Sequence, residues 1–196
     1  MESKDIKTKI VFLGDSSVGK SSILKRLQFN SFDIRNDSTI GCEFTTKDIQ
    51  LSENNVKLLL WDTAGQEVFR SFTQNFLRGA KVVVIVYSFA SKQSFMNIES
   101  WIKETEKLKN RSVVIVGNKS DLPNNIDKED IKKLKEKYEY LYFFENNVSA
   151  KEGKNINELF EYIAEICIKQ NYNYEINNTI KLNKNKEANE ILSRCC

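Results

Sequence analysis

Residues 14–21 read Gly-Asp-Ser-Ser-Val-Gly-Lys-Ser, and they lie between the apolar run Ile10–Leu13 and a segment of helical character at 22–27. The spacing G-x-x-x-x-G-K-[ST] between a strand and a helix is typical of a loop that binds phosphates. Gly14 and Gly19 let the backbone turn tightly and expose successive N–H groups to phosphate oxygens. The helix that follows directs its positive N-terminal end at the same anion. We therefore expect this chain to bind a nucleoside polyphosphate.

Two side chains of this stretch carry specific chemistry. The Lys20 ammonium can bring a positive charge close to the β- and γ-phosphates, and the Ser21 hydroxyl can ligate Mg²⁺. The residues expected to contact the nucleotide in this part of the chain are Gly14, Asp15, Ser16, Ser17, Val18, Gly19, Lys20, Ser21 and Ser22.

The composition excludes several other classes of function. With 196 residues, 40% of them hydrophobic and 29% charged, the chain suits one globular domain with a tail. A net charge of +3, scattered along the chain, argues against nucleic-acid binding. The chain contains no histidine, which excludes Ser-His-Asp triads and His-ligated zinc sites.

The four cysteines, Cys42, Cys167, Cys195 and Cys196, form no C-x-x-C pair, and the first residues lack the apolar core of a signal peptide. We therefore expect a reducing, cytosolic setting without disulfides. No apolar run approaches the roughly 18–20 residues that span a bilayer. Contact with a membrane would require an anchor.

Strands and helices are expected to alternate along the chain. Strands are predicted at 7–14, 44–51, 56–62, 82–87, 113–116 and 141–144, with the second and third forming a hairpin. Helices are predicted at 20–28, 91–109, 128–138 and 155–169, and Cys167 is expected to be a small buried hydrophobe of the last one. The uninterrupted apolar strands at 82–87 and 113–116 indicate a parallel sheet covered on both faces. An α/β fold with its site at the carboxyl ends of the strands follows.

A second motif, Trp61-Asp62-Thr63-Ala64-Gly65-Gln66-Glu67, ends an apolar strand. Asp62 can hold Mg²⁺, through a water molecule. The N–H of Gly65 can approach the γ-phosphate because no side chain blocks it. Gln66 can orient the attacking water, and positioning of this kind dominates phosphoryl transfer.

A third motif, Asn118-Lys119-Ser120-Asp121, follows the buried strand at 113–116. The Asp121 carboxylate accepts hydrogen bonds only, so it suits the N1–H and N2 amine of guanine and rejects adenine. Asn118 can hold the loop and reach N7, and the stem of Lys119 can lie along the base. Backbone N–H groups at Ser149, Ala150 and Lys151 would complete the base pocket.

These motifs, in this order, resemble the Ras-like small GTPases over residues 7–170. The resemblance implies a small G-domain of the P-loop NTPase class, with a mostly parallel six-stranded sheet, one antiparallel strand, and helices on both faces. It places Thr39 at the first-switch threonine that ligates Mg²⁺ and contacts the γ-phosphate, and Phe32 at the aromatic residue that leans on guanine. A core contact is an equal alternative for Phe32. The catalytic set would be Gln66, Lys20, Thr39 and Gly65, the metal set Ser21, Thr39 and Asp62, and the cofactors GTP or GDP with Mg²⁺.

Within this superfamily the chain resembles a Rab, on the stretches 40–44, 57–61, 69–72 and 76–80. Phe44, Trp61 and Phe76 would correspond to the aromatic trio that Rabs present to effectors, although each could simply be a core residue. The usual Rab pattern is broken at three positions, Val68, Ser88 and Leu77. The sequence therefore does not determine which effectors bind. No arginine of the phosphate loop or first switch is an evident arginine finger, so we expect slow hydrolysis and an activating protein in trans.

The chain ends in Ser-Arg-Cys-Cys, and Rabs with this ending carry geranylgeranyl groups on Cys195 and Cys196. Two such chains give stable anchoring where one gives only reversible binding. The resemblance thus implies a G-domain at 1–170, a tail at 171–196, and a monomer that cycles between cytosol and the cytoplasmic face of an endomembrane. Implied partners are an exchange factor, an activating protein, an escort protein, a dissociation inhibitor and trafficking effectors. An ATP-dependent P-loop kinase or ATPase and a nucleotide-bound scaffold with little turnover are the alternatives.

Overall fold

The computed structural model describes residues 4–33, 39, 41–64, 70–106 and 111–172. These residues form a six-stranded sheet in the order β2-β3-β1-β4-β5-β6. The strands are β1 (Lys4–Leu13), β2 (Cys42–Leu51), β3 (Asn54–Thr63), β4 (Val82–Ser88), β5 (Ser112–Asn118) and β6 (Tyr142–Phe143). The β2–β3 hairpin is the antiparallel pair, and the other neighbouring strands pair in parallel. The predicted sheet is confirmed, and each strand lies within a few residues of its expected position.

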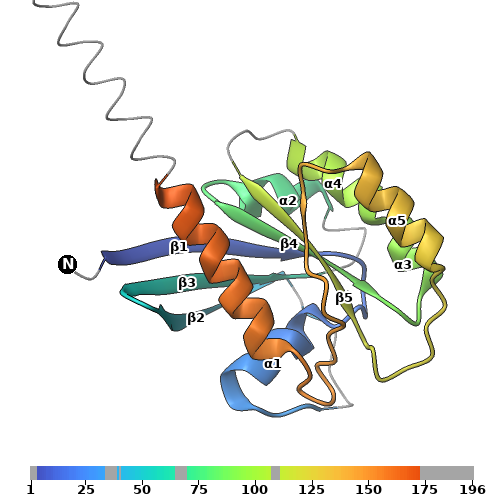
Figure 1. The fold of residues 1–196 in the computed structure, drawn as a ribbon, viewed down its shortest axis with the longest axis horizontal. Coiled ribbons are helices and arrows are strands. Elements are labelled where there is room, and N and C mark those ends of the chain that lie inside the picture. The colour runs from blue at the N-terminus through green and yellow to red at the C-terminus, as the bar shows by residue number, and fades with distance from the viewer. Residues whose placement is uncertain (1–3, 34–38, 40, 65–69, 107–110, 173–196) are drawn as a thin grey trace, which may run out of the picture.

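The helices are α1 (Lys20–Phe29), α2 (Arg70–Leu77), α3 (Lys92–Met96), α4 (Ile98–Glu106), α5 (Lys128–Lys137) and a last helix over residues 156–172. Figure 1 shows α1 and the last helix on one face of the sheet, and α2 to α5 on the other. In the described part of the chain, no helix is both long and apolar enough to cross a membrane.

The alternation of side chains along the strands divides the interior into two cores. Ile10 and Phe12 of β1 point to the face that carries α1 and the last helix, and Phe12 lies 6.1 Å from Phe160 between ring centroids. Val11 and Leu13 point to the opposite core, beneath α2 to α5. This follows from the two-residue period of a strand. Both cores hold β4 and β5, whose residues are all buried.

The helix expected at 91–109 is instead two helices, α3 and α4, which meet at Asn97. The carbonyl of Asn97 accepts from the Ser100 and Trp101 N–H groups at 3.0 and 3.2 Å, and from the Ser100 hydroxyl at 2.7 Å. A serine hydroxyl that bonds back to a main-chain carbonyl competes with regular helical bonding and bends the helix. The apolar spacing, which continues through both helices, does not reveal this break.

The last helix continues to residue 172, beyond the expected end at 169. Gln170 explains the extension, because its Nε2 donates to the Ser112 hydroxyl at 2.6 Å and to the Lys81 carbonyl at 3.1 Å. Cys167 is a buried residue of the same helix, as predicted, and burial raises the pKa of its thiol to about 12.

Candidate nucleotide-binding site

The loop between β1 and α1 requires glycine at two positions. Gly14 has a φ of +135°, and a Cβ there would lie 2.2 Å from the carbonyl oxygen of Val86 in β4. Gly19 has a φ of +98°, and its Cβ would lie 2.3 Å from the Nδ2 of Asn118. Any side chain would therefore push the loop away from the carboxyl ends of β4 and β5. With Ser17 also in the left-handed region, the loop has the backbone alternation that makes a nest of N–H groups for an anion.

Lys20 is the first residue of α1, and its ammonium lies inside this loop. It donates to the carbonyls of Gly14 and Asp15, both at 2.9 Å, and the side chain is buried. Burial lowers the pKa of Lys20 to about 8, although the carboxylates of Asp62 and Asp15 act against this shift. A buried cation in a loop of N–H groups is electrostatically suited to a phosphate, which would restore its charged form.

Three oxygen-bearing side chains converge beside Lys20. The hydroxyls of Ser21 and Thr39 lie 2.8 Å apart, and Thr39 Oγ1 lies 3.5 Å from Oδ2 of Asp62. They come from α1, the segment before β2, and the end of β3. The structure thus brings together the three residues that the sequence predicted as the metal set.

Asp62 provides the test of whether a cation fits there. Its Oδ1 is buried and has no hydrogen-bond partner among the described residues. Burial raises the pKa of the Asp62 carboxyl, against the Ser21 hydroxyl and the Lys20 charge, which lower it. An orphaned carboxylate oxygen beside two hydroxyls fits Mg²⁺, which takes hard oxygen ligands and completes its shell with phosphate and water. Within the described ranges no cluster of three or more His, Cys, Asp or Glu residues offers another site.

Asn118, the last residue of β5, connects the phosphate loop with residues 149–151. Its Nδ2 donates to the Val18 carbonyl of the phosphate loop at 2.9 Å, and its Oδ1 accepts from the Ala150 N–H at 3.1 Å. The side chain is buried. One side-chain amide therefore fixes the phosphate loop relative to residues 149–151, and the contact of Asn118 with guanine N7 stays a prediction.

Asp121 lies just beyond β5, next to Ser149. Its Oδ1 accepts from the Ser149 hydroxyl at 2.7 Å, and the Lys151 ammonium lies 3.9 Å from its Oδ2. These contacts orient the carboxylate, whose side chain is only 6% exposed. The structure brings Asn118, Lys119, Asp121, Ser149, Ala150 and Lys151 together at one edge of the sheet.

The exposed fraction of two aromatic side chains bears on the alternatives left open by the sequence. Phe32 is 36% exposed and Phe44 is 55% exposed, so neither is a core residue. The Phe44 ring lies 5.3 Å from the Trp61 ring. Trp61 and Phe76 are partly buried against the core beneath α2 to α5, so these two serve the core and also reach the surface.

A contact that the sequence did not indicate fixes the side chain of Asp15. Its carboxylate accepts from Asn97 Nδ2 at 2.7 Å and from the Trp101 indole N–H at 2.8 Å. The junction of α3 and α4 is thereby attached to the phosphate loop. The only signal in the sequence was a polar Asn followed at the fourth position by a Trp, which also fits an ordinary amphipathic helix.

Four of the predicted site residues lie outside the described part of the chain. Gly65 and Gln66 belong to the segment 65–69, and Cys195 and Cys196 belong to the segment 173–196. The catalytic role assigned to Gly65 and Gln66 and the lipidation of the two cysteines therefore stay predictions.

Comparisons with known proteins agree with this geometry. The family model of the Ras family matches residues 9–187. Ras-related protein RGP2 of rice, Oryza sativa subsp. japonica, is 43% identical over 159 residues, which cover 79% of this chain and 72% of the relative. Ras-related protein Rab-11B of Dictyostelium discoideum is 38% identical over 200 residues, covering 97% of this chain and 88% of the relative. Ras-related protein RABA1c of Arabidopsis thaliana is 41% identical over 156 residues, covering 78% and 71%.

Proposed function

The chain belongs to the Rab family of Ras-like small GTPases, and we propose that its GTP-bound form recruits effectors of vesicle trafficking to an intracellular membrane. As a member of this family it is a GTPase that works as a guanine-nucleotide switch. The observation that carries the proposal is the convergence of Ser21, Thr39 and Asp62 beside the buried ammonium of Lys20. Those groups come from three separate segments. A bound γ-phosphate can hold the three segments together, and its loss on hydrolysis can release them.

Each group has a defined task in the proposed switch. Lys20 and the loop N–H groups hold the phosphates, and Asp121 selects guanine. Ser21, Thr39 and Asp62 would hold Mg²⁺, which supplies positive charge to the phosphate oxygens. Thr39 lies in the segment that leads to β2, so loss of its contacts on hydrolysis would free that segment. Gln66 orients the attacking water, and Gly65 contacts the γ-phosphate.

The surface that would report the state of the switch lies on β2, β3 and α2. Phe44, Trp61 and Phe76 form the proposed effector contact, and Lys9 Nζ lies 4.4 Å from the Trp61 ring centroid. The same ammonium donates to the carbonyl of Arg78, just after α2, at 3.0 Å. Lys9 therefore connects the end of α2 with the aromatic residues. This connection supports the proposal that a change in the position of α2 alters the effector surface.

Nucleotide selectivity and turnover test the switch itself. Asp121→Asn should shift binding from guanine towards xanthine nucleotides, because an amide can donate where the carboxylate can only accept. Gln66→Leu should slow single-turnover hydrolysis, with wild-type protein and an added activating protein as references. A preference of the wild-type protein for ATP, or rapid hydrolysis that persists in Gln66→Leu, would refute this proposal.

Membrane attachment is tested separately. Two geranylgeranyl groups on Cys195 and Cys196, added with the help of an escort protein, would anchor the protein to a membrane. Imaging of the fluorescent full-length protein should show one type of organelle, and a variant lacking both cysteines should be diffuse. An unchanged distribution would remove the anchor from the proposal but leave the GTPase in place.

A further inference from the structure

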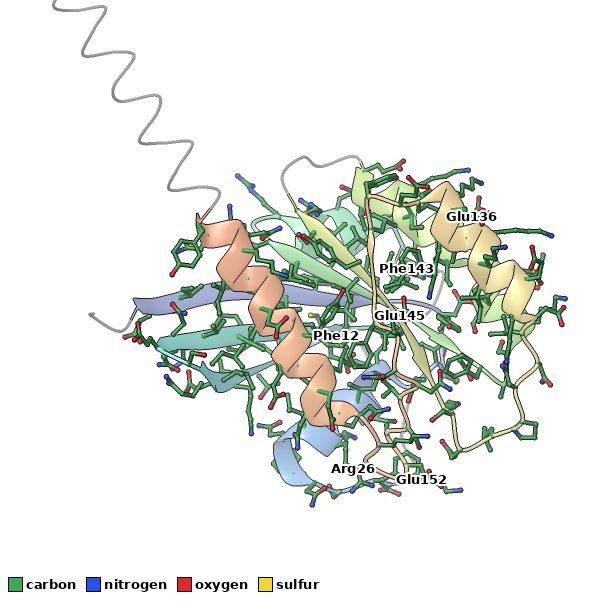
Figure 2. The ribbon with its side chains drawn as sticks, viewed as in Figure 1. Phe12, Arg26, Glu136, Phe143, Glu145 and Glu152 are labelled. Carbon is green, nitrogen blue, oxygen red and sulfur yellow. The ribbon has the colours of Figure 1, made fainter. Side chains whose placement is uncertain are left out.

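Arg26 lies in the last turn of α1, the helix that begins at Lys20 in the phosphate loop. One helix of 10 residues thus has the phosphate site at its first residue and Arg26 near its end. Figure 2 shows Arg26 beside the loop that carries Glu152. This loop also contains Ser149, Ala150 and Lys151, which lie more than 120 positions further along the chain than Arg26.

The guanidinium of Arg26 donates through all of its nitrogens to main-chain carbonyls. Nε donates to Ala150 at 2.8 Å and Nη2 donates to Lys151 at 2.6 Å. Nη1 donates to the Asn30 carbonyl at 2.7 Å, and to the Asn30 side-chain oxygen at 3.3 Å. Two consecutive carbonyls are therefore held by one planar fork, a geometry that a lysine ammonium cannot reproduce.

Holding these carbonyls also orients the N–H groups of the same loop. A peptide unit is planar and trans, so the carbonyl of Ala150 and the N–H of Lys151 point in opposite directions within one rigid group. Fixing the carbonyl towards Arg26 fixes that N–H towards the other side of the backbone. On the neighbouring units, Ala150 N–H donates to Asn118 and the Ser149 hydroxyl donates to Asp121. The loop is thus held between Arg26 and the two residues expected to contact guanine.

We propose that Arg26 is a positioning residue for guanine recognition, which clamps the carbonyls of Ala150 and Lys151 and thereby slows release of the nucleotide. This inference rests on the proposed guanine-nucleotide function. Arg26 acts through the backbone of the loop and does not touch the base. The Lys20 end of α1 has its own contacts with the phosphate loop. A displacement of the Arg26 end of the helix would therefore loosen the base loop while the phosphate loop keeps those contacts.

The test measures release of a fluorescent GDP from the full-length protein with Mg²⁺ present. Arg26→Ala should release GDP about tenfold faster, which corresponds to about 1.4 kcal/mol. Arg26→Lys keeps the charge and the stem but not the fork, so its release rate should lie between those of Arg26→Ala and the wild type. Gln28→Ala, an exposed position on the same helix, is the matched control and should release GDP at the wild-type rate.

Two further readouts separate positioning from general destabilisation. Single-turnover GTP hydrolysis should be unchanged in Arg26→Lys, because Lys20 and the metal set lie at the other end of α1. Hydrogen exchange should increase at the amides of residues 149–152 and stay unchanged in β4 and β5. The inference would be overturned if both Arg26 variants released GDP at the wild-type rate. It would also be overturned if GTP hydrolysis and the hydrogen-exchange protection of β4 and β5 fell in parallel. Failure of the wild-type protein to bind GDP would instead overturn the proposed function.

Discussion

Lys20 and Asp62 are two buried charges of opposite sign, and burial shifts the pKa of each towards its neutral form. Lys20 donates to two carbonyls of the phosphate loop, and Oδ1 of Asp62 has no hydrogen-bond partner among the described residues. Desolvation of an unmatched charge is costly. At the residue scale, the site is therefore preorganised for a ligand that brings a negative phosphate and a cation together.

Proton uptake on nucleotide binding follows from Lys20. Its pKa of about 8 lies below that of an ordinary lysine, so above pH 8 less than half of the free protein carries a proton on Lys20. A phosphate next to the ammonium raises this pKa, so the complex binds more protons and GDP affinity should fall as pH rises through about 8. Calorimetry at pH 8 in buffers of different ionisation enthalpy should detect the uptake. Lys20→Arg keeps a permanent charge and should show none; no uptake in the wild-type protein would contradict the prediction.

Removal of Mg²⁺ should distinguish the role of Asp62 from the roles of the other site residues. We expect Asp62→Asn to weaken Mg²⁺ binding roughly 10- to 100-fold, as for loss of a residue that holds a metal through water. Chelation of Mg²⁺ should then accelerate GDP release in the wild-type protein but change it little in Asp62→Asn. Because the raised pKa favours the protonated carboxyl, acid should weaken Mg²⁺ binding at a higher pH than for an ordinary aspartate. A variant that still responds fully to a chelator would show that Asp62 does not hold the metal.

At the scale of the elements, α4 connects two parts of the site. Its residue Trp101 donates to Asp15 of the phosphate loop at 2.8 Å. Near the other end of α4, the carbonyl and the carboxylate of Glu104 accept from the Gln74 amide of α2, at 3.0 and 2.9 Å. The helix thus touches both the phosphate loop and the helix that follows the proposed catalytic segment.

Substitution of Trp101 tests the first of these attachments. Trp101→Phe keeps a large aromatic ring in the core but removes the indole N–H that bonds to the Asp15 carboxylate. We expect the free energy of unfolding to fall by about 1.5 kcal/mol, the lower end for a hydrogen bond to a charged group. Denaturant unfolding of the GDP-bound protein measures it, with Lys103→Ala on the exposed side of α4 as the control. A loss equal to that of the control would show that the contact contributes nothing.

At the scale of the whole molecule, the two cores are formed by opposite faces of the same strands. The core beneath α1 and the last helix includes Phe12 and Phe160, and the core beneath α2 to α5 includes Ile98 and Ile102. The last helix closes the first core, and Gln170 attaches its end to Ser112 at the start of β5. The end of the folded unit therefore depends on this helix.

Truncation tests where the domain ends, which we propose to be near residue 170. A chain that ends at 172 should unfold at the same denaturant midpoint as the full chain. A chain that ends at 169 loses the two hydrogen bonds of Gln170 and should be less stable by about 1–2 kcal/mol. Gln170→Ala in the full chain is the matched variant and should reproduce that loss. Equal stability of the chains ending at 169 and 172 would place the boundary earlier.

Much of the site could be predicted because its groups are short motifs at strand ends. A recognisable apolar strand ends at or near each of these groups: Lys20, Asp62, Asn118 and Asp121. Parallel strands bring their carboxyl ends to one edge of the sheet. The break at Asn97 and the three extra residues of the last helix were not predicted, because hydrogen bonds to distant residues or to a carbonyl decide them.

The amino-acid sequence alone therefore determined the α/β sheet, the phosphate loop and the choice of guanine, because local spacing and apolar periodicity encode them. Only the tertiary structure decided two further meetings of polar groups across the chain: Asp15 with Trp101, and Arg26 with Ala150 and Lys151. These contacts join residues that are 86 to 125 positions apart. Hydrogen-bond geometry at such separations depends on how the helices pack on the sheet, and no local pattern in the sequence records it.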